Sequence, residues 1–346
     1  MIDRRDFTRL LSIAAATASV AAPSSRAANA SRRIIKPKRL APGDTVALVL
    51  PATAVFEADE IAFAKEQLEA IGLKVAIGPH AYDRHGYFAG RDRDRADDLN
   101  RMFADDAIAG IVCYTGGWGS PRVLPYLDYD LIARNPKVLI GYSDITALLN
   151  AIHQRTGLVT FHGPVGSSTF EPYTLENFRR VVMTPEAAGT VALPAKKPND
   201  LVDRTNRIVR IAPGKASGRL AGGNLTMLAS LMGTPYEIDT NGAILLLEDI
   251  REDLYRIDRM LTQLALAGKF DKAAGIAFGR CTECSYKGPT FSLEEILRDR
   301  FGSGGKPAVS GLSFGHIEQK LTLPIGINAT LDASAGTLSI DEAAVV

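Results

Sequence analysis

Short apolar runs alternate with amphipathic stretches between about residues 40 and 160. Strands are predicted for five of these runs, at 45–50, 74–78, 108–114, 137–141 and 158–161. Helical spacing of apolar residues between them predicts helices at about 58–72, 91–104, 121–133 and 144–154. This alternation predicts a parallel sheet with helices on both faces. Such sheets place their functional sites at the carboxyl ends of the strands.

The periodicity is lost around residues 183–206, where Pro, Lys and Asp accumulate, so a domain boundary is expected there. Further on, the pattern predicts strands at 243–247, 273–278, 321–326 and 336–340, and helices at about 253–267 and 292–301. We therefore predict an α/β protein. A flavodoxin-like or Rossmann-like parallel-sheet domain spans 38–185, a linker spans 186–206, and a smaller mixed α+β domain spans 207–342.

Composition and charge narrow the class of protein. The chain has 346 residues, 46% of them hydrophobic, which is enough for two domains with a core each. Lysine and arginine number 40 and aspartate and glutamate 39, so no strong field attracts nucleic acid or an anionic surface. A nucleic-acid partner is not expected.

The first thirty residues differ from the rest. Arg4 and Arg5 precede a small apolar run at 10–22, and an A-x-A cleavage site follows at 28–30. The pattern predicts a twin-arginine signal over 1–30, with an amphipathic helix as the alternative. The run is too short for a membrane span, which needs about 20 residues. We expect an exported, periplasmic protein without stable membrane insertion after cleavage.

Three cysteines leave several interpretations open. Cys281 and Cys284 form a C-x-x-C that fits a zinc half-site, a redox pair, a local disulfide or two unpaired thiols. A second metal-ligand pair is missing from the sequence, so no metal and no cofactor is expected. Cys113 falls in an apolar strand and is predicted to lie in the core.

Ser143 lies where a predicted strand meets a predicted helix, in "KVLIGYSDITALLN". This is the position of a nucleophile elbow, where a sharp turn exposes the hydroxyl and the helix N-terminus offers N–H groups to an oxyanion. The G-x-S-x-G pattern is incomplete, because position 145 is Ile. The alternative is a helix N-cap, with Asp144 favourable in the first turn.

The loop "CYTGGWGSPR" follows another predicted strand and carries Gly116, Gly117 and Gly119. Such a loop lets the backbone approach a ligand and direct an N–H at an oxyanion, beside the N–H of Asp144. The alternatives are a tight turn or a dinucleotide loop, and the order G-G-W-G does not fit the dinucleotide pattern.

A serine nucleophile needs a base and an orienting carboxylate. Among the five histidines, His162 and His316 follow apolar strands, whereas His80, His85 and His153 are interpreted as surface residues. The carboxylate candidates lie in "ILLLEDIRED" and are Glu248, Asp249, Glu252 and Asp253. Glu248 comes first, at the end of a strand apolar enough to be buried, with helix capping as its alternative role.

The chain resembles the LD-carboxypeptidase family, serine peptidases that trim peptidoglycan tetrapeptides. The resemblance runs in order from about residue 40 to 326, through the segments "PGDTVALVLPA", "YFAGRDRDRADDLNRMFAD", "GGWGSPRVLPYLDYDLI", "KVLIGYSDITALL", "TFHGP", "GRLAGGNLTMLASLMGTP", "ILLLEDIREDLYRIDRML" and "GLSFGHIEQKLTLPIG".

The resemblance implies a catalytic triad of Ser143, Glu248 and His316. It also implies an oxyanion hole formed by the backbone at Gly117 and Asp144, with Gly116, Trp118 and Gly119 as substrate-loop candidates. The sequence departs from the family at Thr115, where Arg is common, and at Trp118, where Tyr is usual. Family members often form homodimers.

The expected function is that of an exported, metal-independent serine carboxypeptidase that takes a murein peptide and releases its terminal D-alanine. The family also contains self-immunity peptidases that cleave peptide–nucleotide antibiotics, an alternative weakened by the export signal. A second alternative, from another class, is a murein-peptide binding protein without catalysis.

Overall fold

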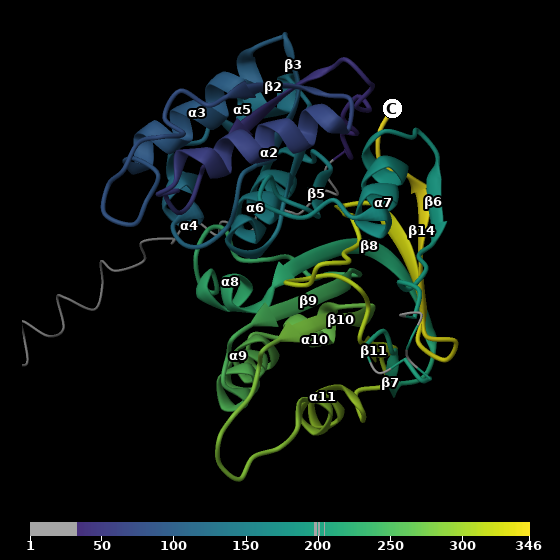
Figure 1. The fold of residues 1–346 in the computed structure, drawn as a ribbon. Helices are drawn as coiled ribbons and strands as arrows, with labels where there is room; N and C mark the ends of the chain where they lie inside the picture. Colours follow the sequence, from purple (N-terminus) through teal and green to yellow (C-terminus); the bar gives the residue numbers. More distant parts are fainter. Residues whose placement is uncertain (1–32, 197–198, 200, 204) are drawn as a thin grey trace, which may run out of the picture. The chain divides into compact units, whose positions relative to one another are not determined.

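The computed structural model describes residues 33–196, 199, 201–203 and 205–346. The predicted signal over residues 1–30 lies outside the described part of the chain. Contacts divide the chain into a unit from Met1 to Arg33 and a unit from Ile34 to Val346, and everything below concerns the second. This unit is built on two sheets with helices packed around them (Figure 1).

The first sheet has the strand order β12-β5-β4-β3-β1-β2. Its strands are β1 (Thr45–Val49), β2 (Lys74–Ile77), β3 (Ile108–Cys113), β4 (Val138–Gly141), β5 (Thr160–His162) and β12 (Leu323–Ile325). β1 to β5 pair in parallel in the flavodoxin-like order 2-1-3-4-5, which confirms the predicted fold class. The strand order reverses between β1 and β3, and folds of this class generally bind ligands outside the carboxyl ends of the strands at such a point.

Helices cover both faces of this sheet. They are α2 (Ala58–Ala70), α3 (Asp92–Ala104), α4 (Ser120–Val123), α5 (Tyr129–Arg134), α6 (Thr146–Thr156) and α7 (Pro172–Val182). α2 and α7 contribute to one apolar cluster and α3, α5 and α6 to another. The single helix predicted at 121–133 is instead α4, a 3₁₀ turn and α5, and Pro125 within that turn lacks the N–H needed to continue a helix.

β12 lies in the segment predicted to form the second domain, but the sheet it joins is the first one. It pairs antiparallel with β5 and forms an edge of the first sheet. The pairing joins residues about 160 positions apart in the sequence, so no local pattern could indicate it. As a result, the segment between β11 and β12, which contains His316, passes from the second sheet to the first.

The second sheet has the order β6-β14-β13-β8-β9-β10-β11-β7. Its strands are β6 (Ala187–Thr190), β7 (Val209–Ala212), β8 (Lys215–Asn224), β9 (Ile244–Ile250), β10 (Gly275–Thr282), β11 (Ala308–Ser310), β13 (Asn328–Asp332) and β14 (Thr337–Ala343). The helices beside it are α8 (Leu225–Ser230), α9 (Leu254–Leu266), α10 (Lys269–Lys272) and α11 (Leu293–Phe301). β6 lies inside the segment expected to be a linker and pairs with β14.

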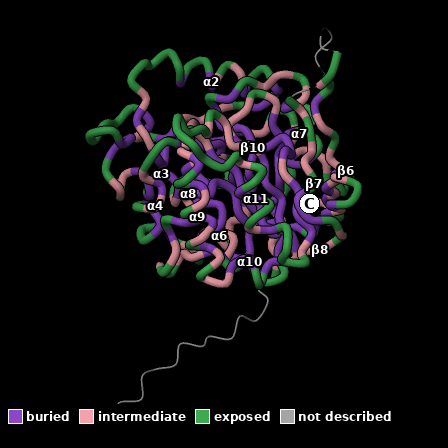
Figure 2. The backbone as a smooth tube through the Cα atoms, turned by 90° about the horizontal axis from the view of Figure 1, so that it is seen from below, coloured by how far each residue is buried: buried purple, intermediate pink, exposed green. Residues whose placement is uncertain are grey.

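One apolar cluster extends across both sheets. Val46 and Leu48 of β1 belong to it together with Ile244 and Leu246 of β9, and all four side chains are fully buried. The neighbouring Leu247 instead packs with α8, α9 and α11 in a separate cluster. Buried backbone accordingly fills the interior, with exposed segments around it (Figure 2). None of the helices in the described residues is long and apolar enough to span a bilayer.

Candidate active site

Ser143 lies on a strained turn between β4 and α6. It begins the 3₁₀ helix Ser143–Ile145, and its φ of 64° is in the left-handed region that non-glycine residues rarely occupy. The turn is tight enough that a Cβ at Gly141 would lie 2.8 Å from Ile145 Cγ2. Ser143 makes no capping hydrogen bond, so the strand–turn–helix interpretation holds and the N-cap alternative does not.

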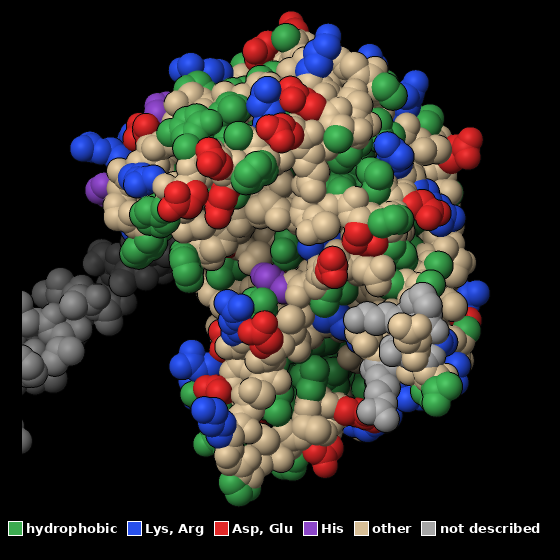
Figure 3. Space-filling model, in the orientation of Figure 1, with side chains coloured by type: hydrophobic (Ala, Val, Ile, Leu, Met, Phe, Trp, Pro, Cys, Tyr) green, Lys and Arg blue, Asp and Glu red, His purple; other side chains and the backbone are tan. Residues whose placement is uncertain are grey.

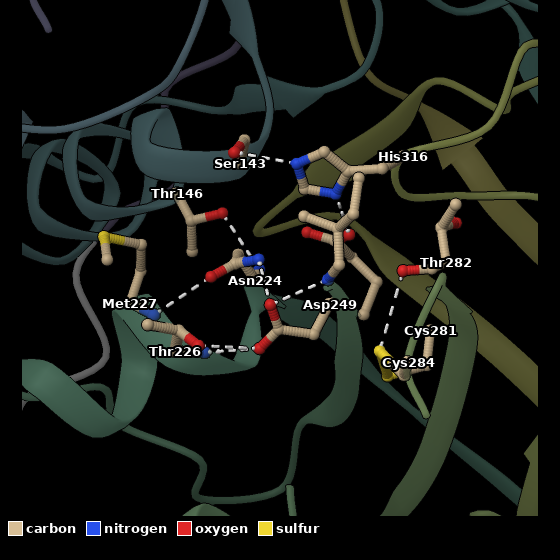
Figure 4. Close-up of polar contacts among 12 residues, drawn as sticks. Ser143, Thr146, Asn224, Thr226, Met227, Asp249, Cys281, Thr282, Cys284 and His316 are labelled. Atoms are coloured by element: carbon tan, nitrogen blue, oxygen red, sulfur yellow. Dashed lines mark hydrogen bonds and ion pairs between the residues drawn. A yellow bond between two sulfur atoms is a disulfide. The ribbon is translucent and has the colours of Figure 1, made fainter. Parts of the chain in front are cut away.

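His316 connects Ser143 to Glu248. Its Nε2 lies 2.8 Å from Ser143 Oγ and its Nδ1 2.8 Å from Glu248 Oε2. Because an ionised carboxylate only accepts, Nδ1 carries the proton and Nε2 accepts from the serine hydroxyl. Figure 4 shows the His316 ring directed at Ser143 from a different segment of the chain. The structure therefore brings together all three residues of the predicted triad.

Glu248 is buried at the carboxyl end of β9, with 0% of its surface exposed, whereas 14% of the His316 side chain is exposed. Gly315 has a φ of +113°, and a Cβ there would lie 2.8 Å from Glu248 Oε2. Glycine before the histidine thus lets the loop approach the carboxylate closely. The serine and the imidazole are thus both partly buried, whereas the carboxylate behind them is fully enclosed.

The glycine loop passes directly over the serine turn. A Cβ on Gly116 would lie 2.8 Å from Ser143 Cβ and 3.1 Å from Asp144 N, so only glycine permits this approach. Gly117 has a φ of +96°. Within the described part of the chain, the N–H groups of Gly117 and Asp144 make no hydrogen bond, which leaves them available to an oxyanion.

The side chain of Asp144 holds the two loops together. Its Oδ2 accepts from Ser120 N–H at 2.7 Å, and the Gly119 N–H also faces this carboxylate. Burial raises the pKa of Asp144, while these N–H groups and the charge of Arg95 oppose the rise. A Cβ on Gly119 would lie 2.5 Å from the Phe88 ring, so this position also requires glycine.

Arg95 supports the glycine loop and was missed by the sequence interpretation. It is 1% exposed, and its Nη1 donates to Pro51 O at 2.6 Å and to Gly119 O at 3.0 Å. The sequence signal that could have found it is its place on the apolar face of the predicted helix, inside the segment "RDRDRADDLN". An arginine from this helix therefore braces a loop that has Thr115 where arginine is common in the family.

Trp118 points outward from the same loop. It is 64% exposed, and its ring lies 6.3 Å from that of Tyr87, edge to face. The two exposed rings form an apolar surface beside the glycine loop.

The other histidines do not contact Ser143. His162 is 1% exposed, and burial lowers its pKa to about 4. His85 is exposed, as expected, and His80 is half-buried and 2.7 Å from Asp98. The surface interpretation of His153 is wrong, because its ring is packed against Gly326 and its Nδ1 lies 2.9 Å from Leu158 O.

A second carboxylate, Asp249, points to the opposite side of β9 from Glu248. Its oxygens accept from Asn224 Nδ2 at 3.2 Å and from the Thr226 N–H and hydroxyl at 3.0 and 2.8 Å (Figure 4). The Asn224 N–H donates to Thr146 Oγ1 at 3.0 Å, which links α8 to α6 directly behind the serine turn. Burial, followed by the charge of Glu248, raises the pKa of Asp249 to about 6. This network fixes the relative positions of β9 and the turn.

Cys281 and Cys284 are joined by a disulfide, one of the alternatives left open by the sequence. Cys113 is free and buried in the core, as predicted. No group of three or more His, Cys, Asp or Glu side chains arranged to hold a metal occurs among the residues that the structure describes.

The space-filling view shows a hollow in one face, with a histidine at its edge and charged side chains of both signs around it (Figure 3). A serine on a strand–turn–helix, a histidine bonded to it and a buried carboxylate behind form the arrangement used by serine hydrolases on several unrelated folds. The fold and the site together define a two-domain α/β protein with hydrolase geometry.

The chain belongs to the LD-carboxypeptidase family. The family's N-terminal domain matches residues 46–163 and its C-terminal domain residues 217–331. A probable murein peptide carboxypeptidase of Bacillus subtilis is 40% identical over 314 residues, which cover 88% of this chain and 94% of the relative. The family match and this relative together identify the chain as a peptidase.

Two solved structures show the same fold. A muramoyltetrapeptide carboxypeptidase from Oxalobacter formigenes superposes with a TM-score of 0.74 at 30% identity, covering 86% of this chain and 99% of that one. The microcin C7 self-immunity protein MccF, in complex with aspartyl sulfamoyl adenosine, gives a TM-score of 0.83 at 30% identity, covering 90% and 100%. The family thus includes relatives of both kinds expected from the sequence.

Proposed function

We propose that this protein is an exported serine LD-carboxypeptidase that removes the terminal D-alanine from peptidoglycan-derived tetrapeptides. The bond cleaved joins the L-centre of a diamino acid to D-alanine. The observation that carries the proposal is the chain of hydrogen bonds from Ser143 Oγ through His316 to Glu248. Each of the two bonds is 2.8 Å long.

Acylation follows from this geometry. Ser143 Oγ attacks the carbonyl carbon of the diamino acid while His316 Nε2 takes the hydroxyl proton. Glu248 stabilises the imidazolium that forms. The N–H groups of Gly117 and Asp144 stabilise the negative charge on the carbonyl oxygen. His316 then gives its proton to the nitrogen of D-alanine, the C–N bond breaks, and an acyl-enzyme remains.

Deacylation uses the same groups, with water in place of the serine hydroxyl as the nucleophile. His316 takes a proton from water, the hydroxide attacks the ester carbon, and Ser143 Oγ leaves with the proton from His316. The products are the tripeptide and the restored serine. Each step uses these side chains, the backbone N–H groups and water.

The test is to incubate the mature protein with defined tri-, tetra- and pentapeptides of murein and to follow D-alanine. We expect release from the tetrapeptide alone, and labelling of Ser143 by a fluorophosphonate probe. Cleavage of aspartyl sulfamoyl adenosine in place of the tetrapeptide would favour a self-immunity function. Peptide binding without cleavage or labelling would indicate a binding protein.

Substitution of Trp118 should change substrate preference more than turnover. Replacing it with Tyr retains an aromatic face but reduces its area and adds a hydroxyl. Because the oxyanion groups belong to the backbone, we expect Trp118→Tyr to alter KM or the preference among peptides, with kcat falling less than about tenfold. A larger fall in kcat at unchanged KM would place Trp118 in transition-state stabilisation.

Export should depend on the twin arginines. We expect replacement of Arg4 and Arg5 by Lys to leave the uncleaved precursor in the cytoplasm, as seen by immunoblotting of cell fractions. The disulfide between Cys281 and Cys284 supports export, because such bonds persist in oxidising compartments. Normal export of the double variant would instead point to the general secretory route.

A further inference from the structure

Lys320 is a buried cation beside the candidate triad. It follows His316 by four residues in the segment that leads into β12, and it is 4% exposed. Its Nζ lies 4.9 Å from the centre of the Tyr142 ring and 3.5 Å from Ser168 Oγ. Among the described residues, no carboxylate lies within ion-pair distance of it. A buried ammonium without a direct counter-ion is costly for the folded state, so a function is the better explanation.

Tyr142 connects this cation to the reacting groups. It precedes Ser143 in the chain, and its ring lies 5.0 Å from the His316 ring, edge to face. Lys320 therefore faces an aromatic ring that also contacts the imidazole. A cation over an aromatic face is held there electrostatically, which fixes its position relative to the histidine.

Several charged groups face Lys320 from the surrounding elements. They are the carboxylates of Glu248 in β9, Glu171 beside α7 and Glu318 in its own loop, and the His162 ring of β5, while the Tyr142 ring lies against the ammonium. Two of the carboxylates already have partners, since Glu248 is bonded to His316, and Glu171 accepts from Thr174 N–H at 2.7 Å. Lys320 is thus a positive charge placed among three carboxylates, one of which belongs to the candidate triad.

We propose that Lys320 is a positioning residue for the reaction: its ammonium balances the negative charge of Glu248 and so sets the lowest pH at which Ser143 reacts. The inference rests on the proposed serine mechanism. His316 must be unprotonated at Nε2 to accept from Ser143, and Glu248 must be ionised. A positive charge held beside the site disfavours the arrival of a further proton there, so it extends activity toward acid pH. Activity over a wider pH range would suit an exported enzyme, because the pH outside the cytoplasm follows that of the surroundings.

Lys320 favours activity in this proposal, but its charge lowers the stability of the folded protein. Burial lowers the pKa of Lys320 to about 8, against the attraction of Glu171, Glu248 and Glu318. The amine therefore binds protons more weakly in the folded than in the unfolded state. Its charge destabilises the fold at all pH values below about 8, and this penalty disappears as the pH rises toward the unfolded value. Removing the amine should not lower the melting temperature, provided that its volume is kept.

The experiment compares Lys320→Met with the wild-type protein. The rate of Ser143 labelling by a fluorophosphonate is measured against pH, with the melting temperature at each pH, and kcat/KM for the tetrapeptide alongside. We expect the acid limb of both profiles to move to higher pH by about half a unit to one unit, as for loss of one charge at moderate distance. The melting temperature should stay equal or rise.

Two variants complete the comparison. Lys320→Arg keeps the charge and should retain the wild-type acid limb. Lys137→Met removes another buried lysine, which binds backbone carbonyls beside the amino end of β4, and should leave the limb in place. An acid limb that is the same in Lys320→Met and the wild type would overturn the inference and leave Lys320 only a packing role. If no murein peptide is cleaved but the labelling profile shifts, the substrate proposal fails and the inference stands.

Discussion

Ser143→Ala and His316→Ala should each lower kcat for the tetrapeptide by roughly 10³-fold or more, because residues that act as one unit lose nearly all of their effect together. The hydroxyl and the imidazole are joined by a single hydrogen bond of 2.8 Å, and the described residues place no other histidine against Ser143. The double variant should therefore be little worse than either single one. Steady-state release of D-alanine measures all three.

The fold should survive these substitutions. Alanine at 143 meets the same positive φ that serine already adopts, and His316 is partly exposed, so its truncation removes little core packing. Melting temperatures close to the wild-type value would confirm this. His85→Ala is the matched control, because that residue is exposed and makes no side-chain contact with the site. Near-normal turnover in His316→Ala would refute the assignment, and His162 would be the next base to test.

The sequence predicts local features of this molecule well. Five strands of the first sheet are continuous apolar runs, such as "TVALVL", and the structure contains each of them. The serine turn could be located for the same reason, since Ser143 follows one of these runs directly. Glu248 could be chosen among four acids because it directly follows the apolar run "AILLL", all of whose residues are buried.

Features that depend on distant parts of the chain could not be predicted. β8 was missed because "KASGRLAGGN" lacks the alternation of a strand, and its glycines are needed where a Cβ would clash with the Gly242 and Leu246 carbonyls of the adjoining segment. Without the resemblance, His316 and His162 could not be separated, since both follow apolar segments. Only the pairing of β12 with β5 determines which of the two reaches Ser143.

Glu248→Gln should lower kcat by about 10²- to 10³-fold while KM changes little. The amide is nearly the same size as the carboxylate but carries no charge, so the imidazolium formed during attack loses its stabilising partner. If the amide turns its NH₂ toward Nδ1, the imidazole is also held in the wrong tautomer and Nε2 can no longer accept from Ser143. Glu248→Ala should cost somewhat less than loss of the serine or the histidine, because Glu248 orients the base without reacting.

The adjacent carboxylate provides a matched comparison, since Asp249 is on the same strand, is equally enclosed and faces away from His316. Every group bonded to its oxygens is a donor, so the NH₂ of an asparagine would meet another donor in Asp249→Asn and lower the melting temperature by several degrees. We expect its kcat to stay within about tenfold of the wild-type value, while Glu248→Gln keeps its melting temperature and loses turnover. If both variants lost the same amount of turnover, the buried charges of β9 would affect activity only by stabilising the fold. Glu248 would then have no specific role in orienting His316.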